Sequence, residues 1–493
     1  MIHKRLGLVT SVLCTLLSVL FVSCSQEEDF AAPTASALRF VVGDFPTFGE
    51  GTQTRAIGTQ DEGKTAWADG DQIIVTLTSQ KYGEQAAALI YDGSSWSTEA
   101  SLSYLENETP SVSVIYAPCY EVTEEGVMQL RSGMQPGMTE YLSGDYEMEY
   151  GLMTITFEGA IRDYSRLRIA AMPEATLTVS TEGFTPAGAN NSSSESGATR
   201  AAEEALNVLP CPKEGSTVLC ATGARSVPQA EGAVTYTLTA DDKGNAYLYG
   251  VFAEEATVSV KQGEVTLKDY TFTAEKNPNG TEHNKSYALD ARPIIDGTLG
   301  GKATAEESDI TALMEQLKAY VDNGITTIIV TGETPAIIDM DYYTNTAIGE
   351  AIYCLSGGDA GYDENNPYNG KIDLILRDVT EVRDYEVWGT HALNSIILPK
   401  VTKLGLEAFH NASFLRTITF GSVITEANET NAFAFFGVGD KVGGCDLILN
   451  CGQMNSEYVP DLDTNTWKFK YEYEFKSITL THTGECDECK ANQ

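Results

Sequence analysis

The sequence predicts a mostly β protein, in which two tandem antiparallel β-sandwich domains are followed by a short repeat solenoid with one capping helix. Three observations predict it. Apolar and polar residues alternate with a period of two through much of the first 290 residues, which is typical of strands with one solvated face. One amphipathic stretch with helical spacing comes next. Apolar residues then recur every 22 positions, as in units that must stack on their neighbours to bury an apolar face.

The first 23 residues have the composition of a secretory signal. Lys4 and Arg5 precede an apolar run that ends with the small Ser23 before Cys24, which is typical of a signal peptide and not of a membrane span. The cysteine at the end of this run resembles the lipobox of bacterial lipoproteins. That resemblance implies that residues 1–23 are removed and that Cys24 is diacylated; the alternative is an ordinary signal peptide with an incidental cysteine.

Residues 24–36 are expected to form an acidic tether, and their acidic run resembles the signal that sends lipoproteins to the cell surface. We therefore expect a lipid-anchored, surface-exposed protein of the outer membrane, with the lipid as its only membrane attachment. The alternative is that the acidic run is a solvated tether and carries no targeting signal. The net charge of −38, from 32 Lys+Arg against 70 Asp+Glu, repels polyanions and disfavours nucleic acid as a partner.

The two predicted sandwich domains span residues 37–180 and 205–296. Period-two alternation runs through Ile73, Val75 and Leu77 and through several later segments, including residues 153–157 and 258–267. Between the two domains, residues 181–204 are rich in Gly, Ala, Ser and Asn and lack apolar periodicity. They are predicted to be a linker or a long loop.

Two short segments of this half resemble the fimbrillin family of pilins. Thr54-Arg55-Ala56 and then residues 64–73 are similar to the opening of those proteins, and residues 284–289 are similar to their last strand. The resemblance implies transthyretin-like sandwiches. In polymerising members a protease cuts after an early arginine, and the vacated groove accepts a strand from another subunit. Arg55 and Ala56 lie where such a cut would fall; the alternative is an uncut loop arginine.

Residues 303–485 are predicted to form the repeat domain, and residues 486–493 a polar tail. The domain opens with a helix from Ser308 to Gly324, followed by a strand over residues 325–330. Leu374, Ile396 and Ile418 then recur with the 22-residue period. The segments 398–401, 407–409 and 415–418 resemble BspA-type leucine-rich repeats, which implies a slightly curved solenoid capped by the helix. Residues 355–369 are predicted to be an insertion.

The motifs of common enzymes are absent from the sequence, which contains no G-x-S-x-G, H-E-x-x-H or P-loop pattern. The histidines outside the signal are scattered, and structural roles are expected for His391 and His410 in the repeat turns. A calcium-like string from Asp461 to Glu472 has Thr466 where the sharp turn of an EF-hand needs glycine. We therefore expect no enzyme activity, no catalytic residue, no cofactor and no metal.

Eight cysteines remain once Cys14 and Cys24 are set aside. An even number in an exported chain permits disulfides. The sequence is compatible both with small local disulfides and with free thiols. The near pairs that qualify are Cys211 with Cys220, Cys445 with Cys451, and Cys486 with Cys489.

Together these features favour a cell-adhesion lipoprotein that binds through its repeat domain. It would be a fimbrial tip or accessory pilin or a stand-alone adhesin, with other pilin subunits or a host or bacterial surface protein or glycan as partners. A stalk subunit is disfavoured because the second sandwich runs directly into the repeat domain. One alternative is a glycan-binding outer-membrane lipoprotein of a nutrient-uptake system, marked by an exposed aromatic platform. Another is a secreted hydrolase, marked by paired carboxylates in a cleft.

Overall fold

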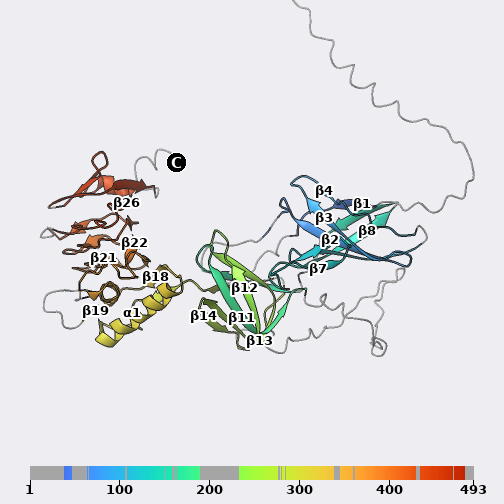
Figure 1. Ribbon diagram of the computed structural model, residues 1–493, viewed down its shortest axis with the longest axis horizontal. Helices are drawn as coiled ribbons and strands as arrows, with labels where there is room; N and C mark the ends of the chain where they lie inside the picture. Colours follow the sequence, from blue (N-terminus) through green and yellow to red (C-terminus); the bar gives the residue numbers. More distant parts are fainter. Residues whose placement is uncertain are drawn as a thin grey trace, which may run out of the picture.

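The computed structural model describes residues 38–46, 64, 66–105, 108–149, 151–157, 162, 164–188, 233–275, 278, 280–283, 285–337, 345–358, 361–428, 433–469 and 471–482. These residues form three units that follow one another along the long axis of the molecule (Figure 1). Strands in several sheets outnumber the two α-helices of the described residues, so the mostly β prediction is confirmed. In the described part of the chain, no helix is long and apolar enough to cross a membrane.

The first unit, residues 38–157, is built on one seven-stranded sheet with the order β1-β9-β8-β5-β2-β3-β4. The sheet folds over at β8, whose first three residues pair with β5 and whose remaining residues pair with β9. Strands β6 and β7 form a separate hairpin. The strands are β1 (Arg39–Val42), β2 (Gln72–Ser79), β3 (Gly83–Tyr91), β4 (Trp96–Ser97), β5 (Ser111–Tyr116), β6 (Tyr120–Val122), β7 (Met128–Leu130), β8 (Leu142–Glu149) and β9 (Leu152–Thr156).

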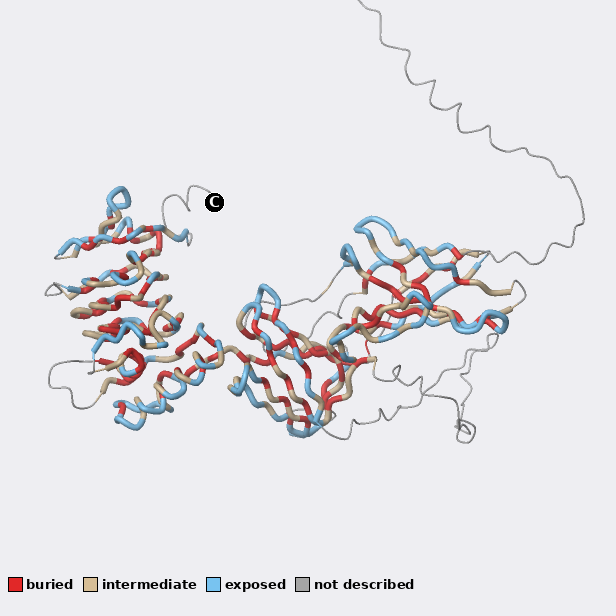
Figure 2. The backbone as a smooth tube through the Cα atoms, viewed as in Figure 1, coloured by how far each residue is buried: buried red, intermediate tan, exposed pale blue. Residues whose placement is uncertain are grey.

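The core of the first unit lies between the two parts of the folded sheet (Figure 2). Ile73, Val75 and Leu77 are fully buried there, as the period-two pattern predicts. Strand β1 lies at the sheet edge and pairs in parallel with β9. The segment after β1 is held by Phe45, which packs edge-on against Trp67 with ring centroids 4.8 Å apart.

The second unit, residues 164–290, is a six-stranded sheet with the path β12-β11-β13-β10-β15, and β14 pairs with β13. The long β13 pairs with β10 at its start and with β11 and β14 further along. The strands are β10 (Ser165–Ala170), β11 (Thr176–Pro186), β12 (Val234–Thr239), β13 (Asn245–Gln262), β14 (Val265–Thr271) and β15 (Ser286–Asp290).

This topology corrects the predicted boundary between the first two domains. Strands β10 and β11 lie within the predicted first domain or at its end, yet Leu167, Ile169, Leu177 and Val179 belong to the core of the second unit. The unit therefore begins near residue 164, and the Gly- and Ser-rich stretch falls between β11 and β12, which are direct antiparallel neighbours. The first residues of the predicted linker or long loop, 181–186, are the end of strand β11, and residues 189–204 lie outside the described part of the chain.

A buried ion pair lies where the first two units meet. Arg162, between the last strand of the first unit and the first strand of the second, pairs with Glu140, and both side chains are buried. A second guanidinium nitrogen of Arg162 donates to the carbonyl of Pro46, at 3.0 Å. The pair thus joins the segment after β1 to the chain before β8.

The C-terminal stack, residues 293–482, is one parallel seven-stranded sheet with the order β16-β18-β20-β22-β24-β26-β30. A second, narrow parallel sheet joins β21, β23 and β25, and β17 pairs with β19. The strands of the wide sheet are β16 (Ile294–Asp296), β18 (Thr327–Thr331), β20 (Ile372–Leu376), β22 (Leu393–Leu398), β24 (Thr417–Phe420), β26 (Asp446–Asn450) and β30 (Ser477–Thr481).

The remaining elements of the stack connect these strands. They are β17 (Thr304–Ala305), α1 (Glu307–Asp322), β19 (Ala336–Ile337), α2 (Ala347–Leu355), β21 (Glu381–Val382), β23 (Lys403–Leu404), β25 (Glu426–Ala427), a 3-10 turn (Cys451–Asn455), β27 (Pro460–Asp461), β28 (Thr466–Lys468) and β29 (Glu472–Glu474).

The 22-residue period is the spacing of the stacked coils. Leu374, Ile396 and Ile418 stand side by side in adjacent strands. Leu447 and Ile478 continue the row after longer connections. All but one of these five side chains are almost fully buried, and Ile478 at the outer strand is 7% exposed. Each coil therefore buries its apolar side chains against its neighbours.

Three details of the stack differ from the prediction. The first strand, β16, already belongs to its sheet, so the stack begins about ten residues before position 303. Helix α1 begins one residue early because Glu306 and Asp309 form a capping box. A second helix, α2, was not predicted: its nine residues are fewer than the roughly 11 to 18 over which a helical period is recognised. Six of the nine are buried, and Glu350, Tyr353 and Cys354 form its outer side.

Candidate functional site

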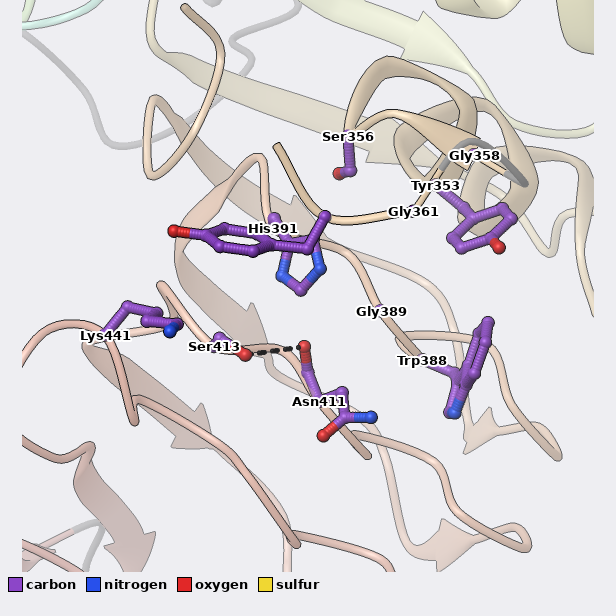
Figure 3. Close-up of a pocket in the computed structure, with 11 residues that line it drawn as sticks. Tyr353, Ser356, Gly358, Gly361, Trp388, Gly389, His391, Asn411, Ser413 and Lys441 are labelled. Carbon is purple, nitrogen blue, oxygen red and sulfur yellow. Dashed lines mark hydrogen bonds between the residues drawn. The ribbon is translucent and has the colours of Figure 1, made fainter. Parts of the chain in front are cut away.

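A pocket opens on the turn side of the C-terminal stack, beside α2. Its volume is about 320 Å³, at the low end of the range for small-molecule sites. Figure 3 shows Tyr353 and Trp388 together at one side and Lys441 at the other, with Asn411 and Ser413 between them. The site is therefore an aromatic wall facing a polar base and a cation.

Successive coils place these side chains next to one another. Tyr353 lies on α2, Trp388 lies in the turn before β22, and Asn411 lies in the equivalent turn of the next coil. Gly389 and Asn411 are 22 positions apart, and both have positive φ, +62° and +58°. At Gly389 a Cβ atom would lie 3.2 Å from the Tyr353 ring, so glycine keeps this side of the pocket open.

Two aromatic pairs flank the pocket. Tyr353 and Trp388 are tilted at 44° with ring centroids 5.4 Å apart. Tyr362 and His391 meet edge-on, with centroids 5.1 Å apart and an angle of 73°. Such contacts stabilise ring orientations, so the flat faces are positioned before any ligand arrives.

The polar base is held by a short network. The backbone N–H of Lys441 donates to the carbonyl of Ser413 at 2.9 Å, and the Ser413 hydroxyl donates to the carbonyl of Asn411 at 3.2 Å. The Lys441 ammonium lies 5.0 Å from the centroid of the Tyr362 ring, a cation–π distance. None of the residues that line the pocket carries a carboxylate.

The imidazole of His391 is neutral near pH 7. Its pKa is lowered from the usual 6.5, first by burial and then by the charge of Lys441. Its Nδ1 atom is buried and has no hydrogen-bond partner among the described residues. The ammonium of Lys441 is therefore the positive charge that the lining residues supply.

A second aromatic feature extends from the pocket along the same turns. We call His410, Phe433 and Phe436 the aromatic ridge. His410 stacks on Phe433 at 5.7 Å and meets Phe436 at 5.5 Å, and its Nδ1 lies 2.7 Å from a carboxylate oxygen of Glu407. The two phenylalanines are 45% and 57% exposed. His410 also contacts Trp388, at 6.5 Å, so the ridge continues directly from the pocket.

Most of the predicted site residues lie outside the described part of the chain. They are Cys24, Arg55, Ala56, Cys211, Cys220, Cys486 and Cys489. Their predicted lipidation, cleavage and pairing stay predictions.

The predicted pair of Cys445 and Cys451 is wrong. Both thiols are buried, but they lie at opposite ends of the extended strand β26. Six residues of strand span about 20 Å, whereas a disulfide needs Cα atoms roughly 4.4 to 6.8 Å apart. Burial, ahead of the neighbouring Asp446 charge, raises the pKa of the Cys445 thiol to about 12.

The calcium-like string folds as strand and turn. Asp461 accepts backbone N–H groups from Asp463 and Thr464, at 3.0 and 3.1 Å. Trp467 is fully buried and donates its indole N–H to the carbonyl of Tyr458. Within the described ranges, no group of three or more His, Cys, Asp or Glu residues is placed to hold a metal ion.

The sequence interpretation missed the pocket because it assigned structural roles to His391 and His410 and named no aromatic residue as a binder. One signal was available. Trp388 and His410 are 22 positions apart, and the same turn position in adjacent coils faces the same side.

The comparisons with known proteins add a distant likeness. No family model matches the chain, and no curated protein matches it significantly. A crystal structure of a putative cell adhesion protein from Bacteroides fragilis matches over 52% of this chain and 92% of that chain, with 13% sequence identity and a TM-score of 0.26. The likeness is too distant to assign a fold family or a function.

Proposed function

We propose that this chain is a surface-anchored adhesion lipoprotein that binds its partner with the C-terminal stack. In this proposal the stack is a BspA-type leucine-rich-repeat solenoid and the first two units are fimbrillin-like sandwiches. The lipid on Cys24 attaches the protein to the outer membrane. The protein acts as a fimbrial tip or accessory subunit or as a stand-alone adhesin, not as an enzyme.

The observation that carries the proposal is the cluster of exposed aromatic side chains on the stack. Tyr362, Phe433 and Phe436 are 43%, 45% and 57% exposed. Large apolar side chains that gather on a surface mark binding sites, and rigid aromatic rings supply contact area at a small entropic cost. The stack is also the unit farthest along the chain from the proposed anchor (Figure 1), where a partner can reach it.

The junction between the second unit and the stack supports a role outside a pilus stalk. Strand β15 ends at Asp290 and β16 begins at Ile294. Only three residues separate them, so the last strand of the second unit is tied to the stack and is not free to enter another subunit. We therefore propose a terminal or separate position in any assembly.

Adhesion of whole cells tests this proposal. An outer-membrane host that displays the full chain should adhere to mucin-coated or matrix-coated wells. The double variant Phe433→Ala, Phe436→Ala should reduce that adhesion at equal surface expression, measured by antibody labelling. Tyr146→Ala, an exposed aromatic substitution on β8 of the first unit, is the matched control. Equal adhesion of all three strains would refute a role of the ridge.

Proteolysis tests the proposed position. An Arg-specific protease should cut the folded protein after Arg55 and yield no SDS-stable ladder of polymers. A ladder would show that the chain polymerises as a stalk subunit does.

A second candidate function is glycan capture for nutrient uptake, which the pocket beside Trp388 favours because flat aromatic rings suit sugar faces. The two functions differ in whether the cell needs the protein to grow on polysaccharides. A strain that lacks the protein should grow normally on polysaccharides if the protein is an adhesin, and slowly on one of them if it serves uptake.

A further inference from the structure

We propose that the pocket of the C-terminal stack binds an acidic saccharide, a pyranose that carries a carboxylate. The sugar ring lies against the Trp388 and Tyr353 side, and its carboxylate pairs with Lys441. This inference rests on the proposed function, because it names the class of ligand that the adhesive unit recognises.

The shape of the pocket indicates a small ring-shaped ligand. A pocket of about 320 Å³ cannot admit part of a folded protein, but it can hold one or two sugar rings. The pair of Tyr353 and Trp388, 5.4 Å apart, presents aromatic surface whose apolar faces match the C–H face of a pyranose. Contact between the rings and this C–H face buries apolar surface, while the hydroxyl groups at the edge of the sugar stay available for hydrogen bonds.

The polar base fits the hydroxyl edge of the same ring. Asn411 and Ser413 lie between the aromatic side and Lys441 (Figure 3). The Asn411 amide supplies donors and an acceptor, and the Ser413 hydroxyl, which donates to the Asn411 carbonyl, supplies an acceptor, so these two side chains suit the mixed hydrogen bonding of sugar hydroxyls.

The charge of the ligand follows from Lys441. Three other lysines of the stack, Lys400, Lys403 and Lys476, each pair with a carboxylate at 2.7 to 3.0 Å. Among the described residues Lys441 has a cation–π contact with Tyr362 and no ion pair. In a chain of net charge −38, a cation at a pocket whose lining holds no carboxylate is complementary to an anionic group. A carboxylate on the sugar supplies that group with a charge-assisted hydrogen bond.

Matched ligands test the charge and the ring separately. The probes are oligogalacturonate and sialyllactose, each compared with its methyl ester, which keeps the ring and removes the charge. Isothermal titration of the full mature protein should show binding of at least one acid and at least tenfold weaker binding of its ester. Trp388→Ala should weaken both forms at least tenfold.

The lysine variant completes the test. Lys441 is exposed, so its substitution should leave the melting temperature of the protein unchanged, which a thermal melt checks. Lys441→Gln should weaken binding of the acid about tenfold and leave the ester unchanged. Lys476→Gln, a paired lysine of the same stack, is the control and should change neither. Equal affinity for acid and ester, no binding of any probe, or an unaltered Lys441→Gln variant would each overturn the proposal. If cells nevertheless adhere through the ridge, the proposed function stands and only the ligand class is wrong.

Discussion

The stacking of coils makes a sharp prediction at Ile396 and Ile397. These neighbours on β22 have the same side chain, but Ile396 is fully buried and Ile397 is 37% exposed. Ile396 stands between Leu374 and Ile418 of the adjacent coils. Truncation to alanine at the two positions therefore removes the same atoms from two different environments.

The expected magnitudes differ severalfold. Ile→Ala removes three carbons, and each buried methylene contributes about 0.8 kcal/mol. The cavity that remains adds to this cost, so Ile396→Ala should destabilise the stack by about 2.5 to 5 kcal/mol. Ile397→Ala loses partly solvated surface and leaves no enclosed cavity, so its cost should stay below about 1 kcal/mol.

Hydrogen exchange in the full chain is the appropriate assay, because three units need not unfold as one. The free energy of opening should fall for the amides of β20, β22 and β24 in Ile396→Ala and stay near its original value in Ile397→Ala. Amides of β2, in the first unit, serve as the internal control. Equal losses at the two positions, or a larger loss in Ile397→Ala, would refute the register that places Ile396 in the core of the stack.

Three further predictions follow from buried groups and from the proposed cleavage at Arg55. Arg162→Met leaves Glu140 buried without its partner and should destabilise the joint between the first two units by about 3 to 5 kcal/mol; adding Glu140→Gln should recover most of the loss in urea unfolding, and no recovery would contradict the pairing. Maleimide at pH 8 should label the exposed Cys354 in the folded protein and spare the buried Cys445, whose raised pKa keeps it a thiol; peptide mapping checks this, and equal labelling would contradict it. After a cut at Arg55, the β1 peptide should co-elute with the body on gel filtration and separate only in denaturant, because Phe45 is buried in the core; immediate release would show that β1 is weakly held.

Local periodicity explains why much of the architecture was predictable. The strand alternation around Ile73 and the helical spacing from Leu313 to Leu317 both describe faces of single elements. The row from Leu374 to Ile418 can also be recognised in the sequence, because coils of equal length place equivalent residues in register. Helix α2 was missed because its nine residues are too few for a helical period to be recognised.

The boundary between the first two units was predicted wrongly for a different reason. The partners of β10 are β13 and β15, which follow it by many residues and lie beyond the Gly- and Ser-rich stretch. Composition distinguishes ordered from irregular segments but carries no information on which strands pair across them. A long loop inside a sheet and a linker between sheets therefore have the same composition.

By itself the sequence determined the β character of this protein, the repeating coil and its buried row, because these properties depend on patterns within a few residues or one period. Only the tertiary structure decided which strands share a core, that Cys445 and Cys451 stay apart, and that Tyr353, Trp388, Asn411 and Lys441 surround one pocket. Each of these four belongs to a different segment of the chain, and stacking brings them together because adjacent strands lie only about 4.8 Å apart. Distance along the chain does not set that spacing; the packing of one coil on the next does.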